Sequence, residues 1–298
     1  MSGWSALACY YVIALAIAGG VMIHAGRLQR RRPETRKVLP KMFPWLDERG
    51  TYANAVSIAR YAFEQPAAWA VWVFASAPTV AGIATAVFAD REASIASLGR
   101  RLRPWNGVGA GGAFATYLVV VGVFAAVSAV YLRVARSATD GRPAIMRDHT
   151  GPRLWALLAG GMFVDEGGLL EEFGWRGFAL PVLVVATGSP WWATIVLAVG
   201  WWAWHLPREV PGLRRSPAWG TFAKQQGQFV ALCVALSALM TVAWRHTGSV
   251  WPAVMIHGGT NVWSKAIGAP MWARTGKDVR SYVVLAAALL VVTAEVVW

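Results

Sequence analysis

Long apolar blocks recur along the chain, and they constrain its fold more than any other feature. Residues 4–24 contain no Asp, Glu, Lys or Arg, and further blocks approach the roughly 20 residues that cross a bilayer as a helix. Hydrophobic residues make up 56% of the chain and charged residues 14%, against about 45–50% and about 25% in a soluble domain. This composition excludes a disordered chain, and two cysteines inside apolar blocks exclude a disulfide scaffold.

The blocks predict an all-α polytopic membrane protein of about eight transmembrane helices with its active site inside the helix bundle, as one integral-membrane domain over residues 1–298. The predicted spans are 4–24, 66–88, 114–132, 154–186, 191–205, 228–244, 250–263 and 282–298. The fourth is too long for one straight crossing. Asp165, Glu166 and two glycines interrupt it, so residues 154–164 are predicted to be a bent or re-entrant entry. Asp165 and Glu166 could line a cavity, but we expect them to be solvated at the interface.

The formal charge of +13 is better explained by a membrane than by nucleic acid. Most basic residues lie between the apolar blocks, and eight fall within residues 26–50, which we expect to be cytoplasmic. No basic residue precedes the first block, which predicts an uncleaved span rather than a signal peptide. The expected partner is therefore the lipid bilayer, with no nucleic acid.

Ionisable residues within apolar blocks are costly and mark a functional site by default. Three segments carry them: Glu171-Glu172-Phe173-Gly174-Trp175-Arg176, Trp201-Trp202-Ala203-Trp204-His205 and His257-Gly258-Gly259-Thr260-Asn261. Glu172 and Arg176 stand one helical turn apart, which predicts an ion pair, while Glu171 points about 100° away. His257 and Asn261 have the same spacing and are predicted to face one point.

A turn at residues 187–190 divides the interval between Glu171 and His205 almost evenly. A helical hairpin with this turn would bring Glu171 and His205 to the same depth in the membrane, nearer its cytoplasmic side.

This set of groups suits hydrolysis, and the residues leave two versions of it open. In the first, Glu171 is the general base, His205 orients the water, and His257 with Asn261 stabilises the oxyanion. In the second, a divalent metal such as zinc is held by Glu171, His205 and His257. The chain therefore uses either no cofactor or a divalent metal, and the local zinc signature His-Glu-x-x-His is absent from its sequence.

The three segments, in this order, resemble the motifs of the CPBP family of intramembrane proteases, which includes the type II CAAX prenyl endopeptidases and the bacterial Abi proteins. The resemblance covers about residues 154–263, which would form the catalytic core. It implies that Glu171 activates water with His205, that Glu172 and Arg176 support the site, and that His257 and Asn261 form an oxyanion hole. Trp201 stands where the family usually has phenylalanine, which affects the shape of the cavity more than its chemistry.

The resemblance implies a peptidase acting on a membrane-anchored, CAAX-like substrate, prenylated or not, and an abundance of Arg, Ala, Val and Gly favours the plasma membrane of a bacterium. Taken singly, the Glu-Glu pair and the two histidines are compatible with purely structural roles. Two rivals remain for the whole set: a noncatalytic scaffold or bacteriocin-immunity protein, and a proton-coupled transporter with Glu171, His205 and His257 as a relay. Replacing Glu171 by Gln should abolish cleavage by a peptidase and be tolerated by a scaffold, whereas a carrier should show flux across sealed vesicles and no cleaved product.

Overall fold

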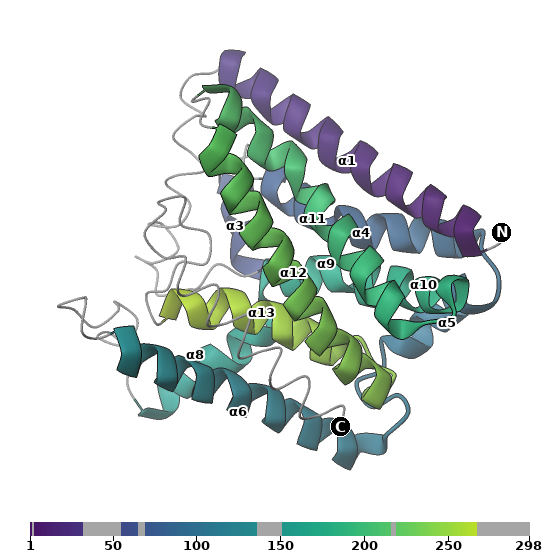
Figure 1. The fold of residues 1–298 in the computed structure, drawn as a ribbon, viewed down its shortest axis with the longest axis vertical. Helices are drawn as coiled ribbons and strands as arrows, with labels where there is room; N and C mark the ends of the chain where they lie inside the picture. The colour runs from purple at the N-terminus through teal and green to yellow at the C-terminus, as the bar shows by residue number, and fades with distance from the viewer. Residues whose placement is uncertain (2, 32–54, 65–68, 136–150, 216–218, 267–298) are drawn as a thin grey trace.

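The computed structural model describes residues 1, 3–31, 55–64, 69–135, 151–215 and 219–266, and this part of the chain forms helices joined by short turns, with no strand (Figure 1). The elements are α1 (Gly3–Arg31), α3 (Ala55–Glu64), α4 (Trp69–Val87), η3 (Arg91–Ala93), α5 (Ile95–Arg101), α6 (Gly109–Ala135), α8 (Gly151–Val164), α9 (Glu166–Gly174), the π-helix η4 (Trp175–Ala179), α10 (Leu180–Thr187), α11 (Pro190–Arg215), α12 (Trp219–Thr247) and α13 (Trp251–Ala266). The all-α class predicted from the apolar blocks is confirmed.

The predicted spans map onto helices, but fewer of them than expected qualify as crossings by themselves. Within the described residues, four helices are long and apolar enough to cross a membrane, by length and composition: α1, α4, α6 and α12. α11 begins as predicted but continues past Pro207 to a basic end, and α13 has 16 residues. The predicted span 282–298 lies outside the described residues. α3 and α5 were not predicted.

The predicted fourth span is broken into several pieces, as its interruption indicated. α8 ends at Val164, and Asp165 then caps α9, its side chain accepting a hydrogen bond from the backbone N–H of Gly168 at 3.0 Å. Such a cap satisfies one of the N–H groups that every helix start leaves without a partner. The chain then runs from α9 through the π-helix η4 into α10 with helical backbone angles at both junctions.

The π-helix η4 is supported from outside its own segment. Pro181 has no N–H, so it cannot supply the usual bond to the carbonyl of Gly177 four residues earlier. Arg101, from α5, donates from Nη1 to this carbonyl at 3.1 Å and also forms an ion pair with Glu92. The short helix α5 is thus tied to the segment that carries Arg176.

Two helical hairpins use the same Thr-Gly-Ser turn. Gly188 between α10 and α11 has φ 65°, and Gly248 between α12 and α13 has φ 62°, values that glycine adopts without steric cost. In each turn the Thr hydroxyl donates to the carbonyl four residues earlier at 2.8 Å: Thr187 to Leu183, and Thr247 to Ala243. These hairpins bring the three polar segments together, and the turn predicted at residues 187–190 is confirmed.

The central helix α9 packs against α4 on one side and α13 on the other, while α1 and α6 lie toward opposite sides of the bundle (Figure 1). Glycines permit the close approach of α9 to these two helices. A Cβ atom on Gly168 would lie 2.6 Å from the carbonyl oxygen of Val254 in α13, and one on Gly174 would overlap the backbone of Pro78 in α4. Small residues at such crossings are typical of membrane helices, which gain little from hydrophobic burial against one another.

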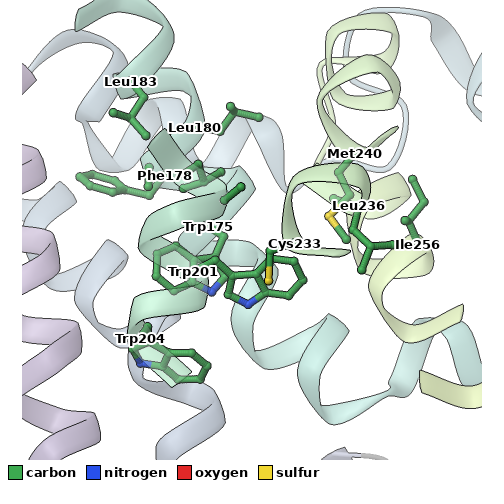
Figure 2. Close-up of a cluster of buried hydrophobic side chains, with 14 of the residues drawn as sticks. Trp175, Phe178, Leu180, Leu183, Trp201, Trp204, Cys233, Leu236, Met240 and Ile256 are labelled. Carbon is green, nitrogen blue, oxygen red and sulfur yellow. The ribbon is translucent and has the colours of Figure 1, made fainter. Parts of the chain in front are cut away.

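Beside the polar segments lies a cluster of buried aromatic and aliphatic side chains. Figure 2 shows Trp175, Trp201 and Trp204 in this cluster, with Cys233 and Leu236 nearby. Trp175 and Trp204 meet edge to face with 6.0 Å between ring centroids, an arrangement that aromatic pairs favour. The cluster fixes the direction of the helix faces that carry the ionisable groups.

Replacing Gly174 by Ala should lower the thermal unfolding temperature of the purified protein. The added methyl group would overlap the backbone of Pro78, and overpacking of this kind costs about 1–3 kcal/mol. Gly122→Ala in α6 is the matched control, because a Cβ there meets no atom within 4 Å. Equal unfolding temperatures for the two variants in one detergent would contradict the close α4–α9 contact.

Candidate active site

The ion pair predicted from sequence spacing is present and fully buried. Arg176 donates from Nη1 to Oε1 and Oε2 of Glu172 at 2.8 and 2.9 Å, and both side chains are 0% exposed. Nη2 of Arg176 donates to Oγ of Ser237 in α12 at 2.7 Å. His257 in α13 contacts Oε1 of Glu172 through Nδ1 at 2.8 Å. The helices α9, α12 and α13 are therefore joined to η4 by one network of hydrogen bonds around this ion pair.

Glu171 has different surroundings from its neighbour. Its Oε2 accepts a hydrogen bond from Nε1–H of Trp201 at 2.9 Å, and the side chain is 6% exposed. His205, one turn after Trp201, places Nδ1 at 2.8 Å from the carbonyl oxygen of Trp201. A carbonyl can only accept, so Nδ1 carries the proton and Nε2 of the neutral ring is an acceptor. Glu171 and His205 are thus both bound to Trp201.

His257 and Asn261 converge, as their spacing predicts. A Cβ atom on Gly167 would lie 2.7 Å from Nε2 of His257 and 3.1 Å from Nδ2 of Asn261. Because Glu172 can only accept, His257 donates from Nδ1, which turns Nε2 toward α9. The two nitrogens therefore face the same side of α9, beside Gly167.

Asp165 is not solvated at the interface, which corrects the expectation from the sequence. Its side chain is 0% exposed, and Oδ1 accepts hydrogen bonds from Nδ2 of Asn261 at 2.8 Å and from the backbone of Gly168. Asp165 therefore holds Asn261 while it caps α9. The signal for this role was the position of Asp165 at the break before a helix, where Asp is a preferred cap.

The structure does not assemble the alternative metal site in the residues that it describes. Within this part of the chain, no group of three or more His, Cys, Asp or Glu side chains is placed to hold a metal ion. Nδ1 of His205 and Nδ1 of His257 contact the carbonyl oxygen of Trp201 and Glu172, contacts of a kind that also orient metal-binding imidazoles. The mechanism proposed below uses the chain's own residues.

All six residues singled out from the sequence, namely Glu171, Glu172, Arg176, His205, His257 and Asn261, are buried in the same region of the bundle. Sequence reasoning missed two further members. Asp165 was assigned to the interface, and the indole N–H of Trp201 was overlooked because this residue was considered only for its shape.

Comparison with known families gives a match over the segment that contains the site. Residues 151–263 match the family model "Type II CAAX prenyl endopeptidase Rce1-like". This segment is similar to the CAAX proteases. The resemblance to the CPBP family is thereby confirmed, and the match supports a peptidase embedded in the membrane that acts on a membrane-associated substrate. No curated protein matches the chain.

Arg176→Met should destabilise the protein by about 3–5 kcal/mol, because it leaves the carboxylate of Glu172 buried without its cation. Combining it with Glu172→Gln should restore part of the loss, since the unpaired buried charge is then absent. Chemical or thermal unfolding in detergent measures both. Arg100→Met removes an exposed arginine and is the control; a cost no larger than in this control would contradict a buried ion pair.

Asp165→Ala should cost about 1–2 kcal/mol of stability from the lost cap and should also release Asn261. Asp165→Asn retains an acceptor oxygen in the same position and should recover most of this loss. The comparison is made by unfolding of the two variants side by side. If Asn were as damaging as Ala, the acceptor role of Oδ1 would be wrong.

Proposed function

We propose that the chain is an intramembrane endopeptidase that hydrolyses a peptide bond of a membrane-anchored, CAAX-like substrate with water activated by Glu171 and His205. The observation that carries the proposal is the different binding of two adjacent carboxylates. Both oxygens of Glu172 are bound by the Arg176 cation, whereas Glu171 accepts from a neutral indole. A carboxylate paired with a cation is a weak base, so Glu172 suits a supporting task, and we assign the base to Glu171.

In the proposed first step, Glu171 removes a proton from water while the water oxygen attacks the peptide carbonyl carbon. Nε2 of neutral His205 is an acceptor and orients the same water. The carbonyl π bond opens, and its electron pair becomes an oxyanion.

His257 and Asn261 would stabilise this oxyanion. As an imidazolium, His257 donates from Nδ1 to Glu172 and from Nε2 to the oxyanion, and the amide of Asn261 supplies a second donor. Before the proton transfer, the ionised forms of Glu171, Glu172, Arg176 and His257 sum to zero charge, which limits the cost of burying them together.

In the second step, the oxyanion re-forms the carbonyl and the carbon–nitrogen bond breaks. The proton taken from water passes from Glu171 to the leaving nitrogen, so a carboxyl product and an amine product result and the enzyme returns to its starting state. We propose that Glu172 and Arg176 hold His257 in place without exchanging protons with the substrate. Residues 154–263 form the catalytic core in this proposal.

Glu171→Gln should lower cleavage by about 10²- to 10⁴-fold, the usual contribution of a general base. The assay uses purified protein in vesicles with a panel of membrane-anchored peptides, prenylated and unprenylated, each with and without a chelator. Asp90→Asn makes the same carboxylate-to-amide change at an exposed residue that is paired with the N-terminal amine rather than with the site, and this variant should cleave like wild type.

The outcomes separate the proposal from its rivals. Product that disappears in Glu171→Gln and survives chelation supports the proposed mechanism, and loss on chelation would instead favour a metal. Full cleavage by Glu171→Gln would contradict the role of Glu171. No product from any peptide, with binding retained, would favour a scaffold, and flux across sealed vesicles would favour a transporter.

A further inference from the structure

One aromatic residue, Trp201, contacts four of the ionisable side chains at the site. Trp201 donates its indole N–H to Glu171 and accepts from His205 through its backbone carbonyl. The guanidinium carbon of Arg176 lies 4.7 Å from the centroid of its ring. The ring of His257 meets it nearly edge to face at 5.0 Å.

The hydrogen bond from Trp201 to Glu171 is directional and is protected from competing hydrogen bonds with water. Trp201 is 2% exposed and Glu171 is 6% exposed, so their 2.9 Å hydrogen bond is shielded from solvent. A donor to an ionised acceptor is worth more than a neutral pair, and an indole ring fixed by its neighbours can donate in one direction only. The bond therefore fixes one oxygen, Oε2, and with it the orientation of the carboxylate plane.

The backbone carbonyl of Trp201 adds a second constraint from the same residue. It receives Nδ1–H of His205 and so determines which nitrogen of that ring is protonated. The side chain and the main chain of one residue thus set the geometry of the acid–base pair, while the face of the ring receives Arg176.

We propose that Trp201 is the positioning residue of the site: its indole N–H holds the Glu171 carboxylate in the orientation required for attack by water. This inference rests on the proposed function, in which Glu171 is the base. Trp201 does not contact the reacting atoms and acts through Glu171. Its loss should therefore reduce the rate of the chemical step more than the binding of substrate.

The test compares Trp201→Phe with Trp263→Phe. Both substitutions replace a buried indole by a smaller ring, and Trp263 is 4% exposed. Among the described residues, the indole N–H of Trp263 has no hydrogen-bond partner, and its ring contacts Phe124 and Trp155 rather than the site. The pair thus separates loss of the Glu171 hydrogen bond from loss of core volume.

The first readout needs no substrate. The infrared carboxylate band of Glu171 is isolated by subtracting the spectrum of Glu171→Gln, in the wild-type, Trp201→Phe and Trp263→Phe backgrounds. The band should shift in Trp201→Phe and stay in place in Trp263→Phe. An unshifted band in Trp201→Phe overturns the proposal.

The second readout is kinetic and uses the membrane-anchored peptide from the panel that the wild type cleaves. Trp201→Phe should lower kcat by about 10- to 100-fold, the range expected for a hydrogen bond to a charged group, with KM within about twofold of the control. A kcat equal to that of Trp263→Phe overturns the proposal. Cleavage that survives Glu171→Gln would instead remove the proposed function, and the infrared comparison would still decide whether Trp201 holds Glu171.

Discussion

The site depends on a buried ion pair that no solvent screens. Glu172 and Arg176 are both 0% exposed, and taking two such charges out of water costs several kcal/mol for each ion unless the pair and its remaining hydrogen bonds are well satisfied. Ser237 and His257 supply those bonds from two other helices. The ion pair therefore requires α12 and α13 to pack beside η4, and it fixes His257 as a consequence. Arg176 itself lies in the π-helix η4, and π-helical segments are frequent at functional sites.

Close packing of α9 is the second requirement, and it comes from residues without side chains. Gly168 and Gly174 admit the backbones of α13 and α4, and Gly167 admits the ring of His257. In a bilayer, lipid tails solvate apolar side chains as well as another helix does, so close contact and interhelical hydrogen bonds carry the association. The polar network and the glycines thus act together to hold the helices in contact. The network supplies directional bonds between helices, and the glycines make the distances short enough for those bonds to form.

Local patterns predicted much of the fold. Apolar length predicted helices over most of the described chain. The break at Asp165 was predicted from the acidic residues and glycines that interrupt the apolar block, and the turn at 187–190 from its turn residues. The number of spans was harder to predict than the helices themselves. Four described helices are long and apolar enough to cross a membrane, whereas the others are short, broken by a π-helix or end in basic residues. Hydropathy averages over a window, so it does not register a helix whose continuity or length depends on its neighbours.

Within the candidate site, the sequence by itself determined the pairs one helical turn apart: Glu172 with Arg176, and His257 with Asn261. These follow from the 3.6-residue period, which acts within one helix. Only the tertiary structure decided which groups meet between helices. It placed the Trp201 indole on Glu171, Asp165 on Asn261 and Ser237 on Arg176, over separations of 30, 96 and 61 residues. The physical reason is that these bonds depend on the rotation and close approach of different helices, which glycines and buried charge set together and which no single segment encodes.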